Sequence, residues 1–277
     1  LNGVNFFWTL QNLIKPFLGT IGILLGCYYL LDCYFLRLEK GRFEQAETIG
    51  SFDITGKLNL LLLMGLVGTV ILSGMCARCY AGLPTVKIMN QTVSLVQIIT
   101  NANLIILAYL SYILTPKHIR YQQHFSWAPI REVTRIFAVI FVTIIPVNLM
   151  LKAGSSGPLA YVLGLTYQNS YPALTYFWLT GAFSAFLDNA PTYLLFFKLA
   201  GGDAQNLMTA QSSILMAISL GSVFMGAITY IGNAPNLMVR ALAKQSGIPM
   251  PGFIGYIIWS CVILLPIFIG VSLWTFL

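Results

Sequence analysis

The chain has 277 residues, of which 57% are hydrophobic and 8% are charged, with a net charge of +7 and a mean hydropathy of +0.79. In an average soluble domain roughly a quarter of all residues are charged. The 15 basic and 8 acidic side chains of this chain are too few to cover the surface of a soluble fold of this size. The basic residues lie singly or in small groups between apolar runs and form no basic helix face, which argues against a nucleic-acid partner. We therefore predict an all-α polytopic membrane protein whose partner is the lipid bilayer.

Apolar segments that can cross about 30 Å of hydrocarbon need roughly 20 helical residues each. Such segments lie at about 16–36, 58–77, 92–114, 133–151, 172–198, 211–242 and 254–277. We expect one membrane domain over residues 1–277, with scaffold-like helices and loops over 1–130 and a transport core over 131–277.

Charge in the loops predicts the orientation of these segments. The loops at 37–57 and 115–135 carry most of the charge and are separated by two expected spans, so they share one side, which the positive-inside rule makes cytoplasmic. A chain that turns back at Asp188-Asn-Ala-Pro191 also brings Arg240 and Lys244 to that side. The charge pattern therefore favours a turn inside the fifth segment over a full span.

We accordingly predict about six transmembrane helices and one re-entrant hairpin. The hairpin covers about 172–200, and its limbs, about 172–187 and 192–200, are too short for two full spans but suit half-depth helices. A broken helix follows over about 211–244.

The tripeptide Asn-Ala-Pro interrupts two apolar segments, as Leu187-Asp-Asn-Ala-Pro-Thr192 and as Ile231-Gly-Asn-Ala-Pro-Asn236. Because proline removes a backbone donor and disfavours helix at the preceding residue, we expect each helix to stop there. Unsatisfied backbone is tolerated at membrane depth only where it faces protein or a water-filled cavity. Freed carbonyl groups can bind a small cation and the next helix N-terminus can bind an anion, although a proline in a membrane helix can also be a simple kink.

Asp188 is the one acid in the middle of an apolar run. A buried carboxylate lowers its cost by binding a cation or a proton, and competition between Na⁺ and H⁺ for it is a physical basis for antiport. The alternative is that Asp188 caps the hairpin by accepting a backbone N–H bond. No second intramembrane acid, membrane-depth histidine or metal-ligand cluster accompanies it, so we expect a transporter and not an enzyme. Glycines 65, 68, 221 and 226 are expected to allow close helix packing.

Three stretches carry a family resemblance: Tyr176-Phe-Trp-Leu-Thr-Gly181, Ser184-Ala-Phe-Leu-Asp-Asn-Ala-Pro-Thr-Tyr-Leu194 and Phe224-Met-Gly-Ala-Ile-Thr-Tyr-Ile-Gly-Asn-Ala-Pro-Asn-Leu-Met238. With them the chain resembles, over essentially its whole length, the citrate-transporter-like, NhaD-type sodium/proton antiporters of the ion transporter superfamily. The resemblance implies an inverted-repeat fold in which each half contributes a hairpin and a broken helix to one midplane ion site. Ile228 departs from the pattern, because relatives are expected to carry a polar asparagine there.

The motifs and the resemblance define a set of candidate ion- or substrate-binding residues. These are Ser184, Asp188, Asn189, Ala190, Pro191, Thr192, Thr229, Gly232, Asn233, Ala234, Pro235 and Asn236. Among them Asp188, Asn189 and Asn233 are the candidate Na⁺ ligands.

Family members are nearly twice as long, and this chain resembles their C-terminal half. We therefore expect an N-terminal half, from the same gene or a separate chain, or a homo-oligomer to complete the site. The predicted function is secondary active Na⁺/H⁺ antiport across the bacterial inner membrane, with Na⁺ and H⁺ as transported ions and no cofactor. The alternatives are Na⁺- or H⁺-coupled citrate or dicarboxylate transport, and an inactive remnant or scaffold subunit.

Overall fold

The computed structural model describes residues 4, 6–38, 56–79, 85–88, 91–122 and 170–277, together with scattered positions between 126 and 164. The expected segment at 133–151 lies mostly outside the described residues. The chain forms two compact units. One contains Leu1–Val4, Trp8–Leu36 and Ser126–Leu277, and the other contains Asn5–Phe7 and Arg37–Phe125.

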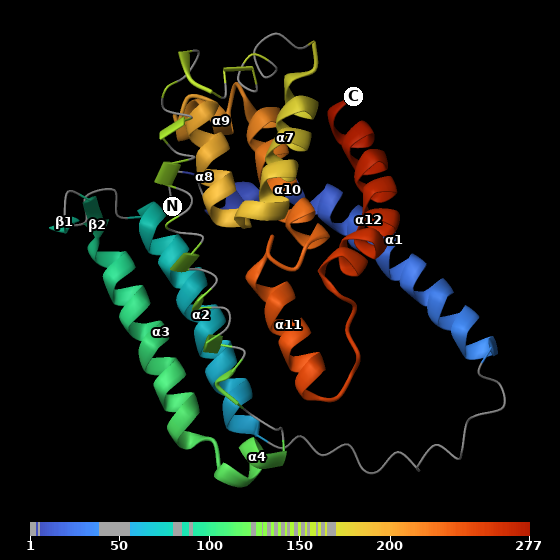
Figure 1. Cartoon of the computed structure of the whole chain (residues 1–277). Helices are drawn as coiled ribbons and strands as arrows, with labels where there is room; N and C mark the ends of the chain where they lie inside the picture. The colour runs from blue at the N-terminus through green and yellow to red at the C-terminus, as the bar shows by residue number, and fades with distance from the viewer. Residues whose placement is uncertain are drawn as a thin grey trace. The chain divides into compact units, whose positions relative to one another are not determined.

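The unit around residues 37–125 is built on two helices that lie side by side, α2 (Lys57–Cys79) and α3 (Leu95–Leu114) (Figure 1). The Asn103 amide on α3 donates to Thr69 Oγ1 on α2 at 2.8 Å, and Asn59 on α2 accepts from the Ser111 hydroxyl on α3 at 3.2 Å, so polar contacts join these two apolar helices. Two short antiparallel strands, β1 (Thr85–Ile88) and β2 (Gln91–Ser94), precede α3, and α4 (Lys117–Gln122) follows it. The sequence did not predict these strands. Because β2 occupies residues 91–94, α3 begins three residues after the expected position of about 92.

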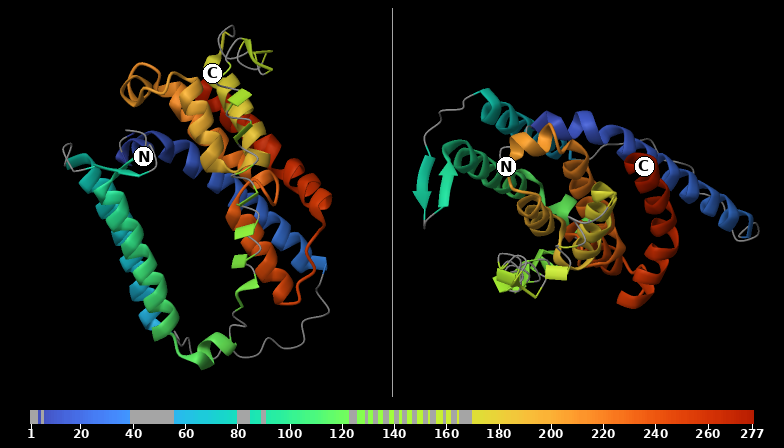
Figure 2. Two further views of the ribbon diagram at one scale, coloured as in Figure 1. Left: turned by 60° about the vertical axis from the view of Figure 1, so that its left-hand side comes forward. Right: turned by 90° about the horizontal axis from the view of Figure 1, so that it is seen from above.

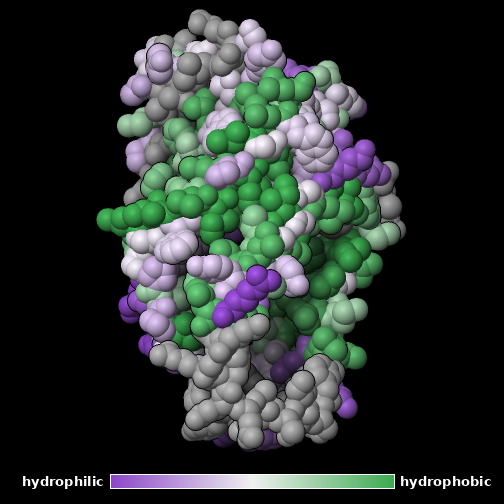
Figure 3. Space-filling view, turned by 90° about the vertical axis from the view of Figure 1, so that its right-hand side faces the viewer, coloured by the Kyte–Doolittle hydropathy of each residue, from purple (hydrophilic) through white to green (hydrophobic). Residues whose placement is uncertain are grey.

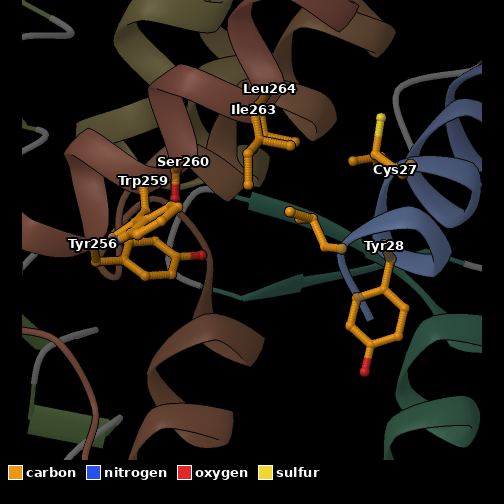
Figure 4. A pocket seen from close by; sticks show the side chains of 9 residues that line it. Cys27, Tyr28, Tyr256, Trp259, Ser260, Ile263 and Leu264 are labelled. Carbon is orange, nitrogen blue, oxygen red and sulfur yellow. The ribbon is translucent and has the colours of Figure 1, made fainter. Parts of the chain in front are cut away.

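The other unit contains two long apolar helices, α1 (Phe6–Leu38) and α12 (Phe253–Phe276). An apolar groove of about 330 Å³ lies between them (Figure 4). Leu24, Cys27, Tyr28 and Leu31 of α1 and Tyr256, Trp259, Ser260, Ile263 and Leu264 of α12 line it. Hydrophobic residues cover a broad area of the molecular surface in Figure 3, as expected for a surface in contact with lipid.

The other helices that the structure describes over residues 170–252 are short and are joined by tight turns. They are α7 (Pro172–Leu187), α8 (Asn189–Leu199), α9 (Ala204–Met208), α10 (Ser212–Phe224), the 3₁₀ helix η2 (Met225–Ile228) and α11 (Ala234–Gln245). Helices α7 and α8 pack side by side and meet in one sharp turn, and α10 packs against both of them (Figures 1 and 2). Their shared core contains the fully buried side chains of Phe177, Phe196 and Ile218.

This arrangement confirms that the chain is helical and that both apolar segments around the Asn-Ala-Pro motifs are interrupted. Four helices in the described residues are long and apolar enough to cross a membrane. They are Phe7–Leu38, Lys57–Cys76, Leu95–Leu114 and Phe253–Phe276. The expected count of about six spans, the re-entrant position of the hairpin and the division of roles between 1–130 and 131–277 stay predictions.

Candidate functional site

Each Asn-Ala-Pro motif begins a helix. Helix α8 starts at Asn189 and α11 at Ala234, so both prolines stand in the first turn of the helix that follows. We expected each helix to end at the proline, and this is wrong in detail. Each proline instead lies in the first turn of the next helix, where a backbone N–H would have no partner within the helix and its absence costs nothing. The interruptions fall before the motifs, at Asp188 and over the nine residues 225–233 that include η2.

Asp188 forms the turn between α7 and α8. Its backbone has φ +75° and ψ 153°, and it is the one described residue other than glycine with a positive φ. This region is occupied essentially by glycine alone, and another residue there costs about 1–3 kcal/mol. The buried carboxylate accepts a hydrogen bond from the Asn189 backbone N–H at 2.6 Å, which confirms a capping contact. Its role as a cation ligand stays a prediction.

The side chain of Asn189 joins the hairpin turn to the broken helix. Its NH₂ group is assigned to face the carbonyl oxygens of Ser222 at 2.8 Å and Gly232 at 3.0 Å, and Ser184 Oγ at 3.0 Å, because its own oxygen would meet only acceptors there. The Ser184 hydroxyl also donates to the Ser222 carbonyl at 2.5 Å. The two interruptions therefore meet in one buried polar cluster.

Two further side chains hold the broken segment in place. Thr229 Oγ1 donates to the Ala185 carbonyl on α7 and accepts from the Gly232 N–H at 2.9 Å. The Asn236 amide on α11 donates to the carbonyl groups of Gly226 at 3.1 Å and Thr229 at 3.0 Å. Side chains thus satisfy backbone groups that no regular helix pairs, as buried backbone in a membrane protein requires.

Glycines allow this close approach. A Cβ atom on Gly232 would lie 2.7 Å from the Gly226 carbonyl oxygen and 2.8 Å from that of Ala185, and one on Gly226 would lie 1.9 Å from the Asn189 side chain. A Cβ on Gly221 would lie 2.4 Å from the Phe177 carbonyl oxygen. The packing role expected for glycines 221 and 226 is confirmed, whereas a Cβ at residue 68 would meet none of the described atoms within 4 Å, so the described residues give that glycine no close packing partner.

The structure therefore brings five predicted residues into one cluster, namely Ser184, Asn189, Thr229, Gly232 and Asn236. Asp188 is linked to the cluster by the hydrogen bond that its carboxylate accepts from the Asn189 N–H. Thr192, one turn later on α8, is fully buried. Ala190 and Pro235 are exposed, and Pro191, Asn233 and Ala234 are half-buried. Asn233 precedes α11 without a side-chain capping bond, so the two motifs are not structurally equivalent. Ile228 lies in the apolar core.

Sequence reasoning missed the contributions of Ser222 and Gly226, which act through backbone carbonyl groups. A carbonyl has no residue signature, and only the glycine itself signals close approach. With these oxygens the site offers neutral carbonyl and hydroxyl groups beside a single carboxylate. Oxygens of these kinds can bind a small hard cation such as Na⁺ when they exchange the hydrogen bonds that they accept here.

A hairpin and a broken helix that share one polar cluster are typical of membrane transporters with discontinuous helices. The chain matches over residues 1–276 the model of the CitMHS_2 family, described as "Putative citrate transport". The chain belongs to this family. None of the curated proteins and none of the solved structures matches it.

The unequal environments of the two asparagines lead to a prediction. Replacing Asn189 with aspartate substitutes an acceptor for the NH₂ group that faces the Ser222 and Gly232 carbonyl groups, so we expect a loss of about 2–4 kcal/mol in stability. The matched change Asn233→Asp keeps a good N-cap residue at the start of α11, so its unfolding temperature should stay near that of the natural protein. Thermal unfolding in detergent measures both, and equal losses would contradict the assigned contacts.

Proposed function

We propose that the chain contributes to secondary active transport of an organic carboxylate, such as citrate, coupled to a small cation. The observation that supports this most is the meeting of the hairpin turn and the broken helix in one cluster beside Asp188. The family match is compatible with the same substrate class.

In this proposal the cation binds between the Asp188 carboxylate and backbone carbonyl groups of the broken segment. The positive charge of the cation compensates for the hydration energy that the carboxylate loses when it is buried. The carboxylate substrate binds at the first turn of α11, at the positive end of the helix, where the Asn233 side chain makes no capping bond. Cation and anion then stabilise each other's binding, which couples their transport.

The cluster comes from one hairpin and one broken helix. We propose that the remaining ligands come from an N-terminal half or a second copy, and that the bilayer is the bacterial inner membrane. These proposals follow the family resemblance.

Uptake of radiolabelled citrate into vesicles that contain the protein tests the function. We expect uptake that requires an inward Na⁺ or H⁺ gradient and that collapses when an ionophore removes the gradient. Protein-free vesicles are the control. Uptake that ignores both gradients would refute coupling, and no uptake of any di- or tricarboxylate would refute the substrate class.

The second candidate is Na⁺/H⁺ antiport, and Asp188 favours it because one buried carboxylate can exchange Na⁺ for H⁺. A pH-gradient assay in vesicles with Na⁺ but without a carboxylate separates the two. Proton movement on addition of Na⁺ alone would favour antiport over carboxylate transport.

A further inference from the structure

Helix α7 carries a polar file that leads to Asp188. Tyr176, Thr180 and Ser184 stand four residues apart, and Asp188 follows after the same interval. All four are buried, with exposed fractions of 3%, 0%, 0% and 8%. Residues at i and i+4 lie on the same face of a helix, so the file runs along one buried face of the hairpin arm. It begins one turn from Pro172, which is exposed.

Thr180 shows that the file is more than packing. Several threonine hydroxyl groups in the described helices donate to the carbonyl four residues back, as Thr20 does to Pro16 and Thr100 to Val96, both at 2.7 Å, whereas those of Thr180, Thr192 and Thr275 do not. Thr180 Oγ1 is fully buried and has no hydrogen-bond partner in the described part of the chain. Buried polar groups in native proteins are satisfied by protein or by ordered water. We therefore expect a small polar molecule, such as water, to hydrogen-bond to Thr180 Oγ1.

The spacing of the file fits water. Four helical residues rise about 6 Å along the axis. A water molecule that makes a hydrogen bond of about 2.8 Å to each of two side chains bridges nearly the same distance. Single waters can thus bridge successive side chains. Ser184 already donates to the Ser222 carbonyl, and its oxygen remains able to accept from a bridging water.

We propose that this file conducts protons between the exposed end of α7 and the carboxylate of Asp188. The proposal rests on the proposed function and identifies H⁺ as a coupling ion. One proton enters from bulk water, each hydroxyl or water accepts a proton and releases its own, and the carboxylate becomes a carboxylic acid. Only O–H bonds change, and no other reactant is required. At Ser184 the hydroxyl must leave the Ser222 carbonyl and turn toward the next acceptor in the file.

The groups around α7 leave Asp188 as the acceptor. In the described residues, the titratable side chains on elements packed against α7 are Tyr193 and Lys198 on α8 and Tyr256 and Cys261 on α12, and Tyr230 follows η2. Arg240 lies over the Tyr230 ring at 4.5 Å, and Lys198 is exposed near the end of α8. The carboxylate at the turn is thus the strongest described base on the file.

The test replaces Thr180 with valine, which keeps the shape and removes the hydroxyl. Proton uptake into vesicles that contain the protein is followed with a pH-sensitive dye while a citrate gradient is imposed. We expect Thr180→Val to slow proton uptake by about tenfold or more. Thr180→Ser should keep the rate within about twofold, because it retains the hydroxyl. Thr20→Val, at a buried threonine with a backbone partner, is the matched control and should also stay within about twofold.

Thermal unfolding shows whether Thr180→Val still folds. Removal of an unpaired buried hydroxyl should leave the unfolding temperature equal or higher. Unchanged proton uptake in folded Thr180→Val would overturn the proposal, as would citrate uptake by the natural protein with Na⁺ and no proton movement. Either result would refute the proton path but leave the proposed carboxylate transport unaffected. Absence of citrate uptake by the natural protein would instead refute the proposed function itself.

Discussion

Replacing Asp188 with asparagine is expected to abolish cation-coupled transport, with a fall in rate of about 100-fold or more. Asparagine can accept the same hydrogen bond from the Asn189 N–H and tolerates a positive φ better than most residues. The substitution therefore removes the charge with little change to the turn. Citrate uptake into vesicles, corrected for the amount of protein in the membrane, measures the effect.

Asp188→Gly is the complementary variant. Glycine adopts the φ of +75° without strain, so the protein should become more stable by about 1 kcal/mol or more even though transport is lost. Loss of transport with unchanged or higher stability in both variants would separate a functional carboxylate from a structural cap. Normal transport in Asp188→Asn would show that the residue serves only as a cap.

Gly232→Ala is expected to disrupt the cluster. The added Cβ would lie 2.7–2.9 Å from the carbonyl oxygens of Gly226, Ala185 and Ser184, and backbone atoms on three sides cannot all move aside. Overpacking of this kind costs typically about 1–3 kcal/mol, and the hairpin turn would separate from the broken helix. We expect a lower unfolding temperature together with a large loss of transport.

The matched control is Gly270→Ala on α12. A Cβ at Gly270 meets nothing within 4 Å, so the variant should transport normally and gain a few tenths of a kcal/mol from helix propensity. If Gly232→Ala behaves like Gly270→Ala, the close contact between the two interruptions does not exist in the working protein.

The sequence predicts the hairpin well because its signals are local. The first limb was expected over about 172–187 and is found as Pro172–Leu187, and the turn falls at Asp188. A lone acid next to Asn-Ala-Pro within an apolar run is a signal that composition and position can reveal. The broken helix was located for the same reason, although its interruption begins at Met225, upstream of the motif.

The rest of the site depends on contacts distant in sequence. The Ser222 carbonyl becomes a site atom because α7 and α10 approach closely, and the Gly226 carbonyl because Asn236 of α11 lies beside η2; a carbonyl has no sequence signature. The different roles of Asn189 and Asn233 follow from their partners, so identical tripeptides could not distinguish them. The strands Thr85–Ile88 and Gln91–Ser94 were missed because four-residue strands give almost no periodicity.

Na⁺-dependent thermal stability of the purified protein tests whether the two interruptions form one cation site at Asp188. A ligand that binds only the folded state at about 100 times its Kd stabilises that state by about 2.7 kcal/mol. Titration of Na⁺ against choline should therefore raise the unfolding temperature of the natural protein by several degrees and leave that of Asp188→Asn unchanged. An equal Na⁺-induced rise in both proteins, or no rise in the natural protein, would show that Asp188 does not hold Na⁺.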